Sequence, residues 1–458
     1  MEEEPLSFVD QALELLEEKQ YPTLRLLLND QMAADINEFF EELPMEKIIV
    51  LYRLLPKELA AEVFVEMDPE QQEYLIGAFS DAELRATLGE LYYDDTADII
   101  EEMPANVVKR ILNNCDPEMR KAVNELLKYP EDSAGSLMTT EFVRLKKNYT
   151  VEASFDLIRR VGIDKETIYT CYVTDEKSHL IGIVTVKDLL LAPLQRLIED
   201  IMTENVISVN TLDDQEQIAM MFSKYDFIAL PVVDNEERLV GIITVDDAID
   251  VLQEETEEDF AKMAAITPND TEYLRTPVFR IWTSRVPWLL LLMISATFTG
   301  IIISKFESAL AVLPILTAFI PMLMDTGGNS GAQSATAVIR SLSLGDIEPR
   351  DALRVLWKEW RVAFLCGATL AVVNFGKMLL VDGLLLSNPN VTVAVAATVS
   401  LSIVFIVMFA KLVGSLLPIG AEKIGLDPAV MANPLISTLT DAVSLLIYIF
   451  IAKLILHI

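Results

Sequence analysis

The sequence predicts a multidomain membrane protein: an all-α superhelical N-terminal domain, a duplicated α/β region, and an α-helical transmembrane domain of five spans. Three observations lead to this prediction. Acidic residues crowd the first 275 positions, one α/β motif occurs twice near the middle, and long apolar runs fill residues 276–458. With 458 residues, the chain is long enough for several domains.

Charge divides the chain into two parts. The formal net charge is −34, yet only 10 acidic and 12 basic residues follow position 275, which leaves 60 acidic and 24 basic residues before it. Such a surplus repels other anions, so it argues against nucleic acid or anionic lipid as a partner and favours cations. Acidity that serves only solubility is an alternative that charge alone leaves open.

Other residue types narrow the function further. The three cysteines lie far apart, which predicts neither a disulfide framework nor a cysteine metal site, and only two histidines argue against a transition-metal site. We find no Ser/His/Asp arrangement and no phosphate-binding loop, so an enzyme is not expected. The first ten residues lack the apolar run of a secretory signal, and the acidic part is therefore expected in the cytosol.

Residues 1–130 are expected to form an acidic helical N domain. Short amphipathic stretches are separated by Pro and Asp, and a loose motif begins at Ala34, Ala61 and Ala97. Each unit ends at a Pro, which stops a helix. The starts are 27 and 36 residues apart, too irregular for a strict solenoid, so a small superhelical stack of helices is predicted.

Residues 131–245 contain a duplication. Residues 168–188 and 227–247 each read as a β run, a polar turn, a second β run with Gly, and a helix opened by Thr and Asp. This pattern resembles a tandem pair of CBS domains, which implies a regulatory module that holds an adenine nucleotide such as ATP. The resemblance implies that Asp188 takes the ribose hydroxyls, with Lys187 and Phe227 nearby. In the alternative, the cleft is empty and Asp188 only caps its helix.

Residues 246–275 are predicted to form an acidic connecting helix. Eight of the fourteen residues from 246 to 259 are carboxylates and none is basic. Asp247, Asp250, Glu254 and Glu258 share one helix face. Like charges at this spacing destabilise a helix unless water or cations surround them. A solvated linker is the alternative interpretation.

Residues 276–458 read as a transmembrane pore domain. Runs long enough to cross about 30 Å of hydrocarbon occur near 286–304, 309–339, 360–382, 391–418 and 430–456. Basic residues lie before the first run, between the second and third, and between the fourth and fifth. The positive-inside rule then predicts a multi-pass protein of the cytoplasmic membrane, surrounded by lipid, with a cytosolic N-terminus and an extracytoplasmic C-terminus.

Two polar features lie within these runs. The segment DTGGNSGAQSAT (325–336) interrupts the second run with small and polar residues, which let helices approach closely. Asp441 lies in the middle of the last run, where a carboxylate is costly and usually faces a polar cavity or a partner. The alternatives are that the segment only packs, and that a protonated Asp441 bonds to Thr438 or Thr440.

The order of these parts resembles the MgtE family of magnesium channels and transporters over essentially the whole chain. The carrying motifs are YPEDSAGSLMT (129–139), the CBS-like pair, the acidic helix, PMLMDTGGNSGAQSAT (321–336) and LDPAVMANPLISTLTDAVSLLIYI (426–449). The resemblance implies a homodimer with its pore on the two-fold axis and Mg²⁺ as both the transported and the regulatory ion. It also implies a gate in which the acidic helix, called the plug, rests on the cytosolic mouth of the pore.

The resemblance further implies which residues meet the ion. In the pore these are Asp441, Asn433 and Ser437. The sensor and gate positions are Glu62, Asp94, Asp214, Glu216, the backbone carbonyl of Ser223, Asp226, Asp247, Asp250, Glu255, Glu258, Asp259 and Asp427. Cytosolic Mg²⁺ at these positions would close the pore. An ion-coupled secondary transporter is the nearest alternative, and a membrane-anchored nucleotide sensor is a more distant one.

Overall fold

The chain folds into two compact units, of which the first ends at Leu252 and the second begins at Gln253. The structure, a computed structural model, describes residues 7–268, 273–274, 276–306, 311, 313–385, 389–431 and 433–457. It contains a helical N-terminal region, two small sheets and a second helical region, as the sequence predicts. One helix, α15 (Val245–Met263), runs through the boundary between the units.

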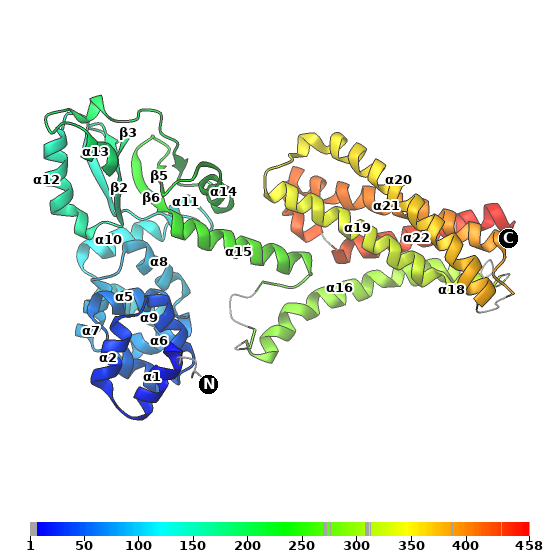
Figure 1. Ribbon diagram of the computed structural model, residues 1–458, viewed down its shortest axis with the longest axis horizontal. Helices are drawn as coiled ribbons and strands as arrows, with labels where there is room; N and C mark the ends of the chain where they lie inside the picture. The colour runs from blue at the N-terminus through cyan, green and yellow to red at the C-terminus, as the bar shows by residue number, and fades with distance from the viewer. Residues whose placement is uncertain are drawn as a thin grey trace, which may run out of the picture. The chain divides into compact units, whose positions relative to one another are not determined.

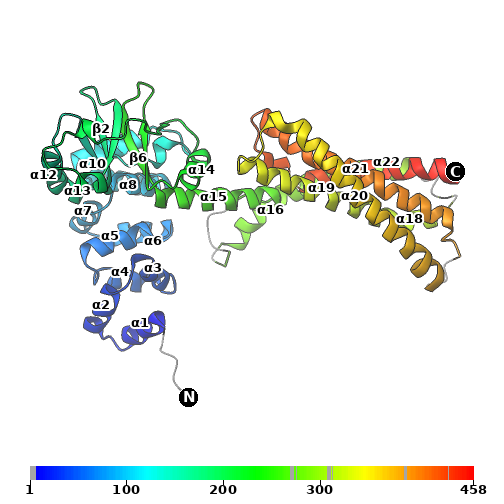
Figure 2. The ribbon, with the colours of Figure 1, turned by 45° about the horizontal axis from the view of Figure 1, so that its top comes forward.

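The first unit begins with ten short helices that stack in alternation (Figures 1 and 2). Helix α3 packs on α5, α5 on α7, and α7 on α9, and α4 packs on α6 and α8 on α10 in the same way. This is the superhelical stack that the sequence predicts. The helices are α1 (Phe8–Glu17), α2 (Tyr21–Asn29), α3 (Ala33–Glu41), α4 (Met45–Tyr52), α5 (Lys57–Val65), α6 (Pro69–Ala78), α7 (Asp81–Leu88), α8 (Tyr93–Glu102), α9 (Ala105–Asn114) and α10 (Pro117–Leu126).

Prolines set the starts of these helices. Pro44 and Pro56 are N-cap residues, and Pro69 is the first residue of α6. A proline lacks an N–H and has a fixed φ, so it costs little at a helix start, where that N–H has no partner in any case. Buried aromatic side chains such as Phe39, Phe40 and Phe64 fill the centre of the stack.

The duplicated region forms two three-stranded sheets, in the orders β1-β2-β3 and β4-β5-β6. In each sheet the first pair of strands is parallel and the second is antiparallel, which fits two copies of one motif. The strands are β1 (Phe142–Lys146), β2 (Thr167–Thr174), β3 (Leu180–Thr185), β4 (Val209–Asn210), β5 (Ala229–Val233) and β6 (Leu239–Thr244). The helices are α11 (Ala134–Leu137), α12 (Val151–Val161), α13 (Val186–Leu191) and α14 (Gln215–Tyr225), with short 3-10 turns at Gly162–Asp164 and Ile198–Asp200.

The repeated glycine has a packing role in both copies. A Cβ on Gly182 would lie 2.9 Å from the Sδ atom of Met202, and a Cβ on Gly241 would lie 2.6 Å from that of Met138. The methionine side chains could shift, but the backbone carbonyl oxygens of Thr203 and Thr139 would lie only 3.1 and 2.8 Å from these Cβ atoms. Glycine is favoured at both positions because another strand-like segment passes over each of them. The glycine is therefore repeated in the sequence because the same close backbone contact occurs in both copies of the motif.

The second unit is a bundle of long helices (Figure 1). Helices α19, α20, α21 and α22 lie side by side, and α16 contacts α22. Their bounds are α16 (Val278–Lys305), α18 (Ile315–Ala318), α19 (Ile320–Ser343), α20 (Ala352–Lys377), α21 (Val393–Lys423) and α22 (Asn433–Leu456). Short helical segments occupy Pro349–Asp351, Met378–Leu385, which is π-helical, and Pro428–Met431.

The structure differs from the prediction of five spans at the second span. Among the described residues, four helical stretches are long and apolar enough to cross a membrane: Val278–Lys305, Pro349–Gly383, Val393–Lys423 and Pro428–Leu456. Helix α19 is 24 residues long, but its polar middle makes it too hydrophilic to join them. The start of the predicted run 309–339 lies partly outside the described residues.

The polar segment interrupts the apolar run but lies within a continuous helix, and its small residues allow the close approach of helices that was expected. Residues 325–336 are continuous α-helix within α19. Its glycines bring the neighbouring helices to backbone contact: a Cβ on Gly414 of α21 would lie 2.2 Å from the carbonyl oxygen of Gly331. A Cβ on Gly327 would lie 2.7 Å from the Oγ atom of Ser444 in α22. The glycines are thus required by close packing of helices rather than by a break.

Candidate functional site

A cavity of about 500 Å³ in the membrane unit holds the strongest candidate site. Polar side chains from two helices line it. Helix α19 contributes Asp325, Gly328 and Asn329, which lie on one face at spacings of three and four residues, and α22 contributes Ser437 and Asp441 one turn apart. Apolar residues complete the wall: Ile303, Ile320, Pro321 and Met324.

Asp325 is a member of this cavity that the sequence analysis did not assign. It is exposed, Asp441 is half-buried, and the two carboxylates interact electrostatically across the space. Asp325 could have been predicted from the sequence, because Asp325 and Asn329 are four residues apart and share a helix face. Ser437 and Asp441 have the same spacing. Ser437 and Asp441 are brought together as predicted, whereas the Asn433 side chain lies outside the described residues.

Oxygen ligands of this kind suit a hydrated divalent cation. Two carboxylates, an amide and a hydroxyl face one space that is large enough to keep water around the ion. Mg²⁺ gives up its water reluctantly and is usually bound by one or two carboxylates with several waters retained. The cavity therefore has the chemistry of a path for hydrated Mg²⁺ rather than of a dry cage.

A second acidic group lies at the end of α15, within the second unit. The Lys262 Nζ atom lies 2.5 Å from Glu258 Oε1 and 2.6 Å from Asp427 Oδ2. Asp259 accepts a hydrogen bond from Ser343 Oγ of α19 at 3.1 Å. Burial lowers the pKa of Lys262, but the hydrogen bonds to Asp427 and Glu258 outweigh it and raise that pKa. The predicted gate residues Glu258, Asp259 and Asp427 thus lie close together. Lys262, which the sequence analysis did not consider, lies among them.

A third acidic group lies in the first unit, between the helical stack and the start of α15. Asp94 is 8% exposed, and its Oδ1 atom is buried without a hydrogen-bond partner. Burial raises the pKa of Asp94 well above its usual range, and the charges of Asp95, Asp247 and Glu166 add to this. Burial, together with Asp95 and Asp247, raises the pKa of Glu166 to about 8. These carboxylates are held close together without a basic partner between them.

The remaining predicted sensor residues lie apart or serve local structure. Asp214 caps α14, since its Oδ1 atom accepts hydrogen bonds from the N–H groups of Glu216 and Gln217. Asp226 ends that helix in the left-handed conformation, with φ 55°. Glu62, Ser223, Asp226 and Asp250 are exposed, and Glu216 and Glu255 are partly buried. Within the described ranges, no three acidic, histidine or cysteine side chains are arranged closely enough to hold a metal ion.

The candidate nucleotide residues also have local roles. Asp188 forms a capping box with Thr185: its Oδ2 atom accepts from Thr185 N at 3.1 Å and from Thr185 Oγ1 at 2.5 Å. This contact fits the interpretation of Asp188 as a helix cap and leaves nucleotide binding untested. Phe227 stacks on Tyr225 with ring centroids 5.4 Å apart, and Lys187 is exposed.

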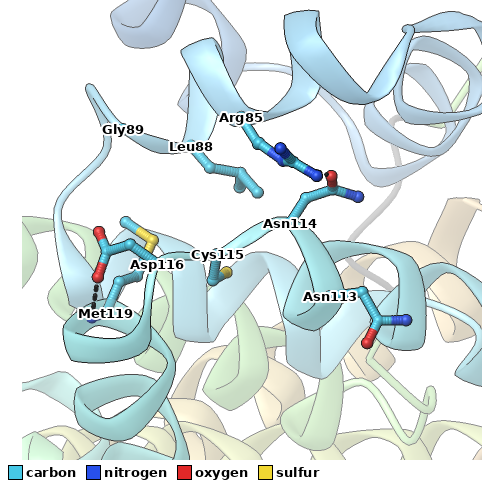
Figure 3. Close-up of a pocket in the computed structure, with 8 residues that line it drawn as sticks. All are labelled: Arg85, Leu88, Gly89, Asn113, Asn114, Cys115, Asp116 and Met119. Carbon is cyan, nitrogen blue, oxygen red and sulfur yellow. Dashed lines mark hydrogen bonds between the residues drawn. The ribbon is translucent and has the colours of Figure 1, made fainter.

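A separate pocket of about 310 Å³ in the helical stack contains none of the predicted residues (Figure 3). Three of its polar side chains have hydrogen-bond partners. Arg85 Nε donates to Asn114 Oδ1 at 3.1 Å, and Asp116 Oδ1 accepts from the N–H groups of Glu118 and Met119. Because these contacts are part of the local helix ends, we do not consider the pocket an ion site.

Comparison with known proteins agrees with this arrangement. The family model described as a divalent cation transporter, MgtE, matches residues 320–451, and the MgtE intracellular N domain matches 31–132. CBS domains match 134–194 and 198–254. The magnesium transporter MgtE of Thermus thermophilus is 40% identical over 448 residues, 97% of each chain. That of Bacillus subtilis is 32% identical over 443 residues, 97% of this chain and 96% of its own.

Solved structures match the first part of the chain. One is the cytosolic domain of the Mg²⁺ channel MgtE in complex with ATP, which is 40% identical, covers 53% of this chain and 99% of its own, and has a TM-score of 0.51. Another is the soluble part of a magnesium transporter, 32% identical, which covers 54% of this chain and 98% of its own with a TM-score of 0.50.

Fold, cavity and comparisons define a multi-pass membrane transporter for divalent cations that carries a CBS pair. More specifically, the chain belongs to the MgtE family, whose relatives in Thermus thermophilus and Bacillus subtilis are named as magnesium transporters.

Proposed function

We propose that this chain forms a magnesium channel for Mg²⁺ influx, which closes when cytosolic Mg²⁺ is high. The observation that carries the proposal is the cavity between α19 and α22, where Asp325 and Asp441 face one space. A ring of carboxylates attracts a cation and excludes anions, while contact through water lets the ion leave again. A relative whose solved cytosolic domain is named as part of a Mg²⁺ channel supports the same interpretation.

The functional unit that we propose is a homodimer. Asp325 and Asn329 are exposed on the single chain although they lie on a helix of the membrane unit. An aspartate that faces hydrocarbon costs about 3 kcal/mol, so this polar face needs a covering partner. A second copy related by a two-fold axis would bring two Asp325 and two Asp441 carboxylates to one central path.

The gate in this proposal uses the two acidic groups outside the cavity. When both are ionised and no cation lies between them, Asp94 and Asp247 repel each other, which favours separation of the helical stack from α15. The residues suit a divalent cation, because the buried Oδ1 atom of Asp94 has no hydrogen-bond partner. Bound Mg²⁺ would supply the missing positive charge, and the carboxylates would then hold the plug residues 246–259 in the closed position.

Lys262 adds a contact to this gate that needs no metal. It holds Glu258 of the plug and Asp427 of the pore domain together through one ammonium group. The same carboxylates are those that the family resemblance assigns to Mg²⁺. Lys262 therefore both favours the closed position and competes with the ion for Glu258 and Asp427.

The finer assignments follow from the same proposal. The chain divides into an N domain (1–130), a CBS pair (131–245), a plug (246–275) and a pore domain (276–458). The first three parts are cytosolic, the pore domain has five spans, and the C-terminus is extracytoplasmic. ATP binds the CBS pair through Lys187, Asp188 and Phe227, as the ATP complex of a 40% identical cytosolic domain suggests.

Electrical recording separates the channel from its nearest alternative, an ion-coupled transporter. In a bilayer with Mg²⁺ as the permeant ion, the dimeric channel is expected to give unitary currents that disappear in millimolar cytosolic Mg²⁺. Mg²⁺ uptake that occurs without unitary currents, and that stops when a proton gradient is removed, would favour the coupled transporter.

The bridging gate has its own test. Replacing both Asp226 and Asp250 with Ala removes repulsion, which favours closing, and also removes ligands of the bridge, which favours opening. If bridging dominates, the double variant conducts at Mg²⁺ concentrations that silence the wild type. Closure at lower Mg²⁺ than the wild type would refute bridging and leave the channel assignment intact.

A further inference from the structure

The membrane unit buries a lysine that the proposed ion path does not use. Lys411 lies within α21, and its side chain is 5% exposed. An ionisable side chain inside a membrane domain is expensive unless it has a polar partner. Lys411 has one: its Nζ atom lies 3.3 Å from the Oγ atom of Ser334 in α19.

Ser334 connects this lysine to a third helix. The Ser334 hydroxyl accepts from Lys411 and donates to the Oε2 atom of Glu359 in α20 at 2.6 Å. Ser334 itself is 2% exposed. A buried cationic residue and an acidic residue are therefore joined through one hydroxyl, and the three side chains come from three different helices.

The network lies one turn from a close crossing of α19 and α21. Gly331 precedes Ser334 by three residues, and Gly414 follows Lys411 by three residues. A Cβ at Gly414 would lie 2.2 Å from the Gly331 carbonyl oxygen, so the backbones of α19 and α21 touch there. Such a contact holds the two helices close together, and the hydrogen bonds of the network add a directional constraint on the rotation of α19.

Rotation of α19 would affect the cavity because one face of the helix lines the cavity and the opposite face packs against other helices. Asp325 and Ser334 are nine residues apart, which places them on opposite sides at about 100° per residue. Asp325, Gly328 and Asn329 line the ion cavity, and Ser334 lies on the packing side with Gly331. Any rotation of α19 would move Asp325 relative to Asp441.

We propose that Lys411, Ser334 and Glu359 form a positioning network that sets the rotation of α19 and thereby aims its cavity face at Asp441. Hydrogen bonds are directional, so a donor from α21 and an acceptor on α20 define one orientation for Ser334. The network acts through α19 and does not touch the ion. The inference rests on magnesium transport and is the same for a channel and for a coupled transporter, because ion uptake is measured in either case.

The test compares single substitutions in the full chain, purified and placed in lipid vesicles. Ser334→Ala removes only the bridging hydroxyl. We expect its thermal unfolding midpoint to stay near that of the wild type, while Mg²⁺ uptake per folded protein falls about tenfold and the half-saturating Mg²⁺ concentration shifts. Ser402→Ala is the matched control, because Ser402 is also fully buried but its hydroxyl bonds only within its own helix, to Thr398.

Charge variants separate positioning from stability. Lys411→Met leaves Glu359 without its counter-charge, so its unfolding midpoint should drop. The double variant Lys411→Met/Glu359→Gln should recover the midpoint without recovering uptake, and Lys411→Arg should retain part of the uptake. Wild-type uptake and half-saturation in Ser334→Ala, or full uptake in the double variant, would overturn the inference. If Lys411→Met does not fold, Ser334→Ala and the double variant still decide it.

Discussion

The two units of the chain differ in the surroundings of their buried charged side chains. In the first unit, Asp94, Asp247 and Glu166 lie close together, and burial together with the neighbouring carboxylates raises the pKa of Asp94 and of Glu166. In the second unit, buried Lys411 reaches Glu359 through Ser334. Carboxylates in the first unit can take up protons from the surrounding water, which relieves their repulsion. An ionised side chain among membrane helices is costly unless it has a polar partner.

Asp325 and Asp441 differ from Lys411, since they face one cavity and no basic residue is among the described residues that line it. By the rule that applies to the rest of the bundle, this pair requires a cation or water beside it. The comparison teaches that unpaired carboxylates in either unit mark the places where a transported or regulatory cation is expected. The paired charges of Lys411 and Glu359 instead join three helices through Ser334.

The largest expected effect is at the cavity. Asp441→Asn should lower Mg²⁺ uptake about a hundredfold or more, because a unit charge near a divalent ion contributes about 3 kcal/mol or more. Asp325→Asn should lower it about tenfold, since Asp325 is the more exposed of the two. Uptake of ²⁸Mg²⁺ into cells without their own importers measures both. Normal uptake in Asp441→Asn, with Asp346→Asn as control, would make the carboxylate structural.

A smaller effect is expected at the plug. Lys262→Met removes both the metal-free contact to Asp427 and the competitor of Mg²⁺. The variant should therefore be more open in chelator, yet reach half-closure at about fivefold lower Mg²⁺, as expected for about 1 kcal/mol at a partly exposed ion pair. Current as a function of cytosolic Mg²⁺ measures both changes, with exposed Lys423→Met as control. An unchanged titration would show that Lys262 is irrelevant to the gate.

A pH effect is expected in the first unit. Burial and neighbouring carboxylates raise the pKa of Glu166 to about 8. The proton that Glu166 holds in the packed arrangement stabilises it below the ordinary carboxyl pKa, and this stability is lost as the pH rises toward 8. In chelator, hydrogen-exchange protection of α8 should fall from pH 6 to pH 9. Glu166→Gln should flatten this dependence, whereas exposed Glu118→Gln should not. The same pH dependence of protection in Glu166→Gln and in the wild type would contradict the proposal that Glu166 titrates within this cluster of carboxylates.

The smallest effect is expected at the CBS pair. Asp188→Ala should weaken ATP binding about tenfold and cost about 1 kcal/mol of local stability through loss of the helix cap. Transport through the open pore should not change. Calorimetry with ATP measures the affinity, and the unfolding midpoint separates the cap from the ligand contact. Absence of ATP binding by the wild-type chain at millimolar concentration would remove the nucleotide from the proposal.

Local features were within reach of the sequence. Thr185 and Asp188 are three residues apart, and their hydrogen bonds form as soon as the helix forms, so the cap could be predicted from spacing alone. The division between acidic and apolar parts, the duplicated α/β motif and the carboxylate at Asp441 were equally visible. Each depends on composition or on neighbours a few positions away.

Contacts between distant positions were decided by the tertiary structure. Lys411 lies 77 residues from Ser334, and no pattern in the sequence connects them. Asp325 joins the cavity of Asp441 only because α19 and α22 pack with their glycine and serine faces together. The continuity of α19 through DTGGNSGAQSAT was also decided there. Polar, glycine-rich sequence favours a break in isolation, but close packing against α21 and α22 buries those glycines as a helix.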